Sequence, residues 1–117
     1  MERFALDEED AFRAFVKATP RALVLLRGVG CAYSAAFERT FTAERAPEGW
    51  SRVVRQVEEG GRGPVGEALG VEVTPTVVAF VAGAEAARLP GKLLVGISRG
   101  SYLRWLRTLA RVDLSGR

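Results

Sequence analysis

The sequence contains no histidine and no asparagine, one glutamine (Gln56) and one cysteine (Cys31). A single cysteine excludes a disulfide within the chain, so any disulfide has to form with another molecule. Without histidine, a zinc site would need to be built almost entirely from carboxylates, and we predict neither a metal nor another cofactor. The scarcity of heat-labile amides favours a thermophilic or GC-rich source.

Long hydrophobic runs are also missing from the chain. No apolar stretch approaches the roughly 20 residues that a membrane-spanning helix needs. The first ten residues, MERFALDEED, are acidic and lack the apolar region of a signal peptide. We therefore predict no membrane partner and a cytoplasmic location. The 117 residues, 48% of them hydrophobic and 26% charged, predict a single globular domain over residues 1–117.

Lysine is rare, since only Lys17 and Lys92 are lysines among 17 basic residues, and the formal net charge is +3. We attribute the arginine content to the same compositional bias and predict no nucleic-acid partner. The last predicted helix carries arginines at a spacing of i, i+3 and i+7: Arg104, Arg107 and Arg111. This stripe has two interpretations, a phosphate-binding face or an ordinary solvated helix face, and the second is favoured.

The hydrophobic pattern alternates between helices and buried strands. Residues 22–26, ALVLL, are apolar without alternation, which is typical of a central strand buried on both faces. Residues 82–84 have the composition of a hairpin turn. Helices are expected at about 8–18, 32–45, 64–70 and 99–112, and strands at 22–26, 50–57, 77–81 and within 85–96. This order predicts an α/β fold with a mixed four-stranded sheet and helices on both faces.

Two motifs carry a resemblance to thioredoxin. Cys31-Ala32-Tyr33-Ser34 stands at a strand-to-helix junction, where that family has its C-x-x-C motif, and residues 70–80, GVEVTPTVVAF, are similar to the family's G-[IV]-x-x-x-P-T followed by an apolar strand. The resemblance covers roughly residues 8–110 and implies a thioredoxin-like fold. It also implies a cis Thr74–Pro75 bond beside Cys31, with the backbone at Thr74 pairing with a substrate peptide.

The position of Cys31 at a helix start has its own chemical meaning. Unpaired backbone N–H groups and the positive end of the helix dipole favour the thiolate and lower the pKa of the thiol. Ser34, one helical turn further on, could donate its hydroxyl to that thiolate. The alternatives are that Cys31 is an inert, buried apolar residue and that Ser34 is a solvent-facing helix residue. The junction favours partial exposure of Cys31.

Several positions depart from the thioredoxin pattern. Ser34 replaces the second, resolving cysteine, and Leu25 stands where the family has a buried acid. Tyr33 is similar to the third motif residue of glutaredoxins, but their glutathione signature after the proline is missing. A monothiol can form a mixed disulfide but cannot release itself intramolecularly.

The sequence thus leaves two functional hypotheses open. In the first, the chain is a monothiol redox protein, a candidate oxidoreductase, that acts on protein or low-molecular-weight thiols and disulfides. Cys31 and Ser34 are then its catalytic residues, and Tyr33, Thr74 and Pro75 bind the substrate. In the second, it is a redox-inactive interaction module that has kept the peptide groove. Residues 84–96 form either a simple loop insertion or part of a partner surface, and the sequence does not indicate an oligomeric state.

Overall fold

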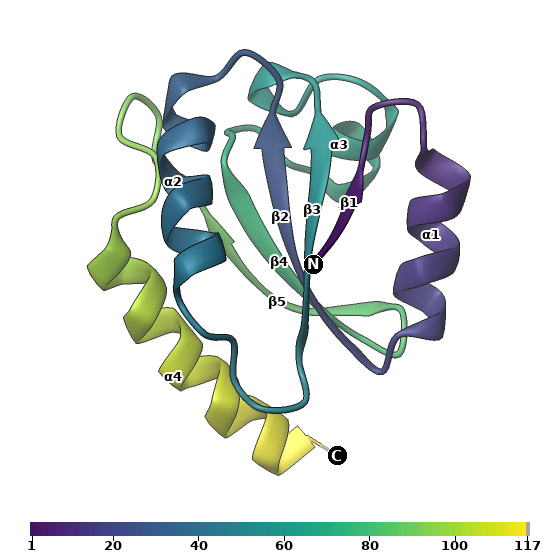
Figure 1. Cartoon of the computed structure of the whole chain (residues 1–117), viewed down its shortest axis with the longest axis vertical. Coiled ribbons are helices and arrows are strands. Elements are labelled where there is room, and N and C mark those ends of the chain that lie inside the picture. Colours follow the sequence, from purple (N-terminus) through teal and green to yellow (C-terminus); the bar gives the residue numbers. More distant parts are fainter. Residues whose placement is uncertain (117) are drawn as a thin grey trace.

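The computed structural model describes the backbone of residues 1–116 and the side chains of residues 1–111. Helices and strands alternate over the first two thirds of the chain, and a hairpin and a long helix complete it (Figure 1). The elements are β1 (Glu2–Phe4), α1 (Glu9–Ala18), β2 (Arg21–Gly28), α2 (Ala32–Ala43), β3 (Ser51–Val57), the 3-10 turn η1 (Glu59–Gly61), α3 (Pro64–Leu69), β4 (Thr76–Val81), β5 (Ala84–Pro90) and α4 (Arg99–Gly116). None of the described helices is long and apolar enough to cross a bilayer.

The sheet is mixed and has five strands in the order β1-β3-β2-β4-β5. The prediction of four strands is wrong because it misses β1, which pairs in parallel with β3 through Glu2 opposite Val53 and Phe4 opposite Arg55. β1 has only three residues, two of them charged, so it shows no alternation of apolar and polar residues that would predict a strand. Its pairing with β3, and not its own sequence, specifies this strand. β2 pairs in parallel with β3, and the pairings of β4 with β2 and β5 are antiparallel.

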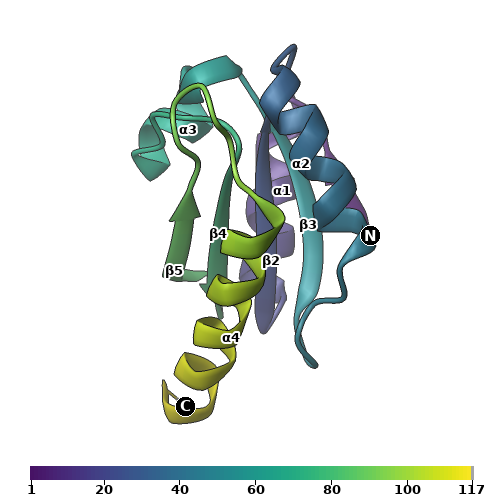
Figure 2. The same ribbon diagram turned by 90° about the vertical axis from the view of Figure 1, so that its left-hand side faces the viewer.

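Helices cover both faces of the sheet, as predicted. α2 and α4 pack on one face, and α1 and α3 pack on the other (Figure 2). The central strand β2 supplies both cores, because alternate residues point to opposite faces. Leu23 and Leu25 belong to the core under α2 and α4, whereas Val24 and Leu26 belong to the core under α1 and α3.

Arg55 is a buried charge in the middle of β3, and no pattern in the sequence predicts its burial. Its side chain is buried between β3 and α1, with the guanidinium 5.4 Å from the ring centre of Phe12. The guanidinium donates to the backbone carbonyls of Ala5 and Leu6, in the connection between β1 and α1. Burial lowers the pKa of Arg55, and acidic residues at the start of α1 oppose that shift. Arg55 therefore fixes the path of the chain that leads out of β1.

The boundaries of α1, α2 and α3 lie within two residues of the predicted ones, whereas α4 continues to Gly116 instead of ending near residue 112. The Ser98 hydroxyl accepts the N–H of Ser101 at 3.1 Å and caps α4. The turn between β4 and β5 uses Ala82 and Gly83, which have φ values of 51° and 85°. Before α1, by contrast, the cap position is held by Glu8, whose carboxylate accepts the N–H of Ala5 at 2.8 Å instead of capping the helix.

Glu38 on α2 ties the helix to two strands. Its carboxylate lies 2.7 Å from the Arg3 guanidinium of β1 and also accepts a hydrogen bond from Arg27 of β2. Burial raises the pKa of Glu38, but the hydrogen bonds and charges of the two arginines outweigh this and hold the pKa below its ordinary value.

We expect Glu38→Gln to lower the free energy of unfolding at neutral pH by about 1 kcal/mol. Because the pKa of Glu38 is depressed by folding, this contribution is complete above the unfolded-state pKa of about 4.3 and is lost as the pH falls through the lower, folded-state value. Urea unfolding of wild type and variant from pH 7 to pH 3 measures it. Glu67→Gln, at an exposed carboxylate, is the control, and a pH-independent difference between wild type and Glu38→Gln would contradict the expectation.

Candidate functional site

Cys31 lies where β2 has ended and α2 begins. The chain turns after Gly28, with the N–H of Cys31 donating to the Gly28 carbonyl at 3.2 Å. Gly30 has a φ of +77°, a left-handed conformation that L side chains adopt rarely. Cys31 then occupies the N-cap position of the 12-residue helix α2. The sulfur is thus held at the end of the helix where backbone N–H groups lack intrahelical partners.

The Thr74–Pro75 segment packs directly against this thiol. Its peptide bond is cis, and both residues are buried. The thiol of Cys31 donates to the Thr74 carbonyl at a distance of 3.6 Å. Gly28 makes the close approach possible, because a Cβ there would lie 2.4 Å from the Thr74 hydroxyl oxygen. Residues predicted from two distant motifs are therefore in contact.

Cys31 is less exposed than the sequence suggested. Its exposed fraction is 6%, because Thr74 and the turn at Gly28 cover the sulfur. The solvent-facing interpretation of Ser34 is wrong: its side chain is fully buried, and its hydroxyl oxygen accepts the Gly28 N–H at 3.0 Å. A hydroxyl that accepts one hydrogen bond keeps its proton available for a second partner.

The surroundings of Cys31 favour its thiolate. Burial raises the pKa of the thiol, but the hydroxyl and the backbone N–H of Ser34 lower it, as do the hydroxyl of Thr74 and the N–H of Tyr33, and the net pKa lies below the ordinary value of a cysteine. While protonated, the thiol donates to Thr74 and does not cap the helix. The donors at the start of α2 therefore act on the charged form, once the proton has left.

The core beneath this site is apolar. Leu25 is fully buried and packs in the same core as Phe37 and Val54. Its position therefore offers no acid to move a proton to or from Cys31. Any proton exchange at the sulfur has to involve the hydroxyls around it, solvent or a bound partner.

The segment that links β5 to α4 runs alongside the site. At its start, a Cβ on Gly91 would lie 2.3 Å from the Pro75 carbonyl oxygen, and at its end a Cβ on Gly96 would lie 3.2 Å from the Cβ of Tyr33. Lys92 and Gly96 exchange two backbone hydrogen bonds of 3.0 and 2.8 Å, which close a tight turn over residues 93–95. This turn is the loop that extends beside the N-terminal half of α2 in Figure 1.

The turn, whose two ends lie against Pro75 and Tyr33, presents apolar side chains to solvent. Leu93 and Leu94 are each 74% exposed, and Val95 is exposed as well. Two further exposed apolar residues flank Cys31 in the chain, Val29 and Tyr33. We refer to residues 29, 33 and 93–95 together as the apolar rim. The sequence allows residues 84–96 to be either a simple loop insertion or part of a partner surface. Only the packing of the two glycines that bound the turn places part of this segment beside the site.

Comparisons with known proteins connect this architecture to thioredoxins at the level of the fold. No protein-family model matches the chain, and no curated protein sequence matches it. A thioredoxin of Malassezia sympodialis is 14% identical, with a TM-score of 0.67 over 92% of this chain and 90% of that one. A mutant thioredoxin of Halobacterium salinarum is 15% identical, with a TM-score of 0.65 over 92% and 89%. The reduced desulfothioredoxin of Desulfovibrio vulgaris is 23% identical, with a TM-score of 0.60 over 93% and 99%. The chain therefore has a thioredoxin-like fold, as its two motifs implied.

Proposed function

We propose that this chain is a monothiol thiol–disulfide exchange protein that uses Cys31 as its nucleophile and acts in the cytoplasm. The observation that carries the proposal is the set of donors around the sulfur, which lowers the pKa of Cys31 despite its burial. An inert, buried cysteine has no such donors, and its pKa is raised by apolar surroundings. Ser34 and the start of α2 stabilise the thiolate, and Tyr33, Thr74 and Pro75 form the surface that receives the substrate.

The exchange proceeds in two steps. The Cys31 thiolate attacks one sulfur of a substrate disulfide, so that a bond forms between Cys31 and that sulfur while the other substrate sulfur leaves as a thiolate. The protein has no second cysteine with which to resolve this mixed disulfide. A low-molecular-weight thiol in its thiolate form therefore attacks the substrate sulfur and regenerates the Cys31 thiolate. The small thiol ends in a mixed disulfide with the substrate, which a further equivalent of the same thiol can reduce.

The apolar rim favours a protein as the substrate. A polar small disulfide gains little from the exposed side chains of Leu93 and Leu94, whereas a peptide with apolar residues beside its cysteine can bury them. The backbone at Thr74 is placed next to the sulfur, where an extended peptide could pair with it. The apolar rim could equally bind a partner in the alternative function, an interaction module without redox chemistry. The 6% exposure of Cys31 favours this alternative.

The pH dependence of alkylation separates these two functions. We expect iodoacetamide to alkylate Cys31 in the folded protein, with a midpoint below that of a free thiol, about 8.5. Incubation with a small disulfide should add one half of that disulfide to Cys31, as intact mass would show, and Cys31→Ser should abolish the addition. No alkylation of the folded chain, or a midpoint at or above that of a free thiol, would leave the interaction module as the function.

A further inference from the structure

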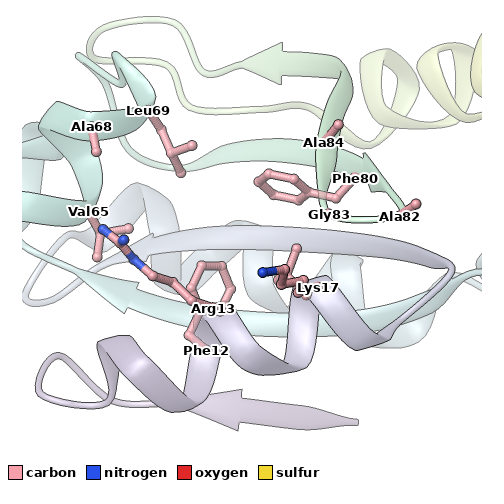
Figure 3. Close-up of a pocket in the computed structure, with 11 residues that line it drawn as sticks. Phe12, Arg13, Lys17, Val65, Ala68, Leu69, Phe80, Ala82, Gly83 and Ala84 are labelled. Atoms are coloured by element: carbon pink, nitrogen blue, oxygen red, sulfur yellow. The ribbon is translucent and has the colours of Figure 1, made fainter.

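A cavity lies on the face of the sheet that carries α1 and α3, away from α2. It opens between α1, α3 and the turn that joins β4 to β5 (Figure 3). Its volume is about 490 Å³, within the range of about 300–1,000 Å³ that small-molecule sites occupy. None of the residues of the candidate thiol site lines it.

The walls of this cavity are apolar. Phe12 and Val16 of α1 and Phe80 of β4 line the cavity, and all three are buried members of the core beneath α1 and α3. Leu69 of α3 closes one end, and the backbone of Gly83 lies at the other. An apolar chain inside would cover the apolar surface that the lining still exposes, which stabilises the complex by about 25 cal/mol for each Å² that is buried.

Two basic side chains lie at the edge of the cavity, and none of the described residues that line it is acidic. Arg13 and Lys17 are one helical turn apart on α1 and both line the cavity, and Figure 3 shows the Arg13 side chain reaching toward Val65. The charge of Arg13 is compensated by Glu9, whose carboxylate lies 2.5 Å from its guanidinium. In the described part of the chain, no carboxylate lies within salt-bridge distance of Lys17. The cavity therefore combines an apolar interior with one uncompensated positive charge.

We propose that this cavity binds a single-chain monocarboxylate of medium length, such as a ten-carbon acyl chain. The chain would lie between Phe12, Phe80 and Leu69, and the carboxylate would meet the ammonium of Lys17. A monoanion matches the single uncompensated charge of Lys17 at the edge of the cavity. A carboxylate close to Arg13 would also compete with Glu9 for the hydrogen-bond donors of the guanidinium. This site is separate from the chemistry at Cys31 and does not depend on it.

The experiment is a calorimetric titration of the full chain with decanoate, kept below the concentration at which it forms micelles. We expect saturable binding of one decanoate, a weakening of ten-fold or more in Lys17→Glu, and weaker binding of decanol and of decyltrimethylammonium than of decanoate. Lys92→Glu, at the only other lysine of the chain, is the matched control and should bind as the wild type does.

A second variant tests the location of the site. Ala68→Trp places a large ring at the exposed mouth of the cavity and should abolish binding while the melting curve stays that of a folded protein. The proposal is overturned if decanoate does not bind saturably, if Lys17→Glu binds as tightly as Lys92→Glu, or if folded Ala68→Trp still binds. Equal affinity for decanoate and decanol would overturn the role of Lys17 in recognising a carboxylate.

Discussion

Replacing Ser34 by alanine is expected to move the midpoint of Cys31 alkylation to higher pH and to slow alkylation at neutral pH. The hydroxyl of Ser34 is the largest of the contributions that lower the pKa of the thiol, and alanine removes it. The same change leaves the buried Gly28 N–H without its acceptor, which costs about 1–3 kcal/mol of folding free energy. The measurements are the rate of iodoacetamide alkylation from pH 5 to pH 10 and urea unfolding.

The matched control for this prediction is Thr42→Ala, on the same helix. The Thr42 hydroxyl is exposed and donates only to backbone carbonyls of its own helix, those of Glu38 and Arg39. Its removal should leave the midpoint of Cys31 alkylation unchanged and the free energy of unfolding within about 0.5 kcal/mol of the wild type. If Ser34→Ala changed only the plateau rate and kept the midpoint, Ser34 would control access to the sulfur and not its pKa.

Replacing Gly28 by alanine is expected to damage the fold and the site together. The new Cβ would lie 2.4 Å from the Thr74 hydroxyl oxygen and 3.2 Å from the Cβ of Cys31, so Thr74 has to move away. Overpacking of this kind costs roughly 1–3 kcal/mol. The displacement should also remove the hydrogen bond from the Gly60 N–H to the Thr74 hydroxyl, now 3.2 Å long. Amide NMR shifts of Gly60 and Cys31, together with the melting temperature, report both effects.

Gly100→Ala is the corresponding control. Gly100 lies in the first turn of α4, where a Cβ would meet only the flexible end of Arg104 at 3.4 Å. Alanine is the better helix former there by roughly 0.5–1 kcal/mol, so this variant should be as stable as the wild type or more stable. A Gly28→Ala variant with the same stability as Gly100→Ala would contradict the close approach of Thr74 to the end of β2.

The elements that have a strong pattern of their own could be predicted from the sequence. The unbroken run ALVLL identified β2, and the composition of residues 82–84 identified the turn between β4 and β5. The three residues of β1 and the burial of Arg55 could not be predicted, because both depend on partners from elsewhere. β1 needs the edge of β3, and Arg55 needs the carbonyls of Ala5 and Leu6.

The candidate site shows the same division. The motifs placed Cys31 and Thr74 together, because their positions in the chain resembled a known family. The burial of Ser34 against the Gly28 N–H depends on the exact turn that leads from β2 into α2, which no sequence pattern determines. The apolar cavity could not be predicted from the sequence either, because its lining comes from α1, α3 and β4, whose side chains become neighbours only in the folded chain.

The order of the strands also has a consequence for synthesis on the ribosome. β2 lies between β3 and β4, and its residue Leu25 pairs with Val54 on one side and with Val77 on the other. While the nascent chain grows, β3 becomes available first, and the second edge of β2 stays unpaired until Val81 has left the exit tunnel. During that interval a strand with five apolar residues that are fully buried in the finished fold, residues 22–26, exposes unpaired backbone groups. Other chains or a chaperone can bind a strand in this state.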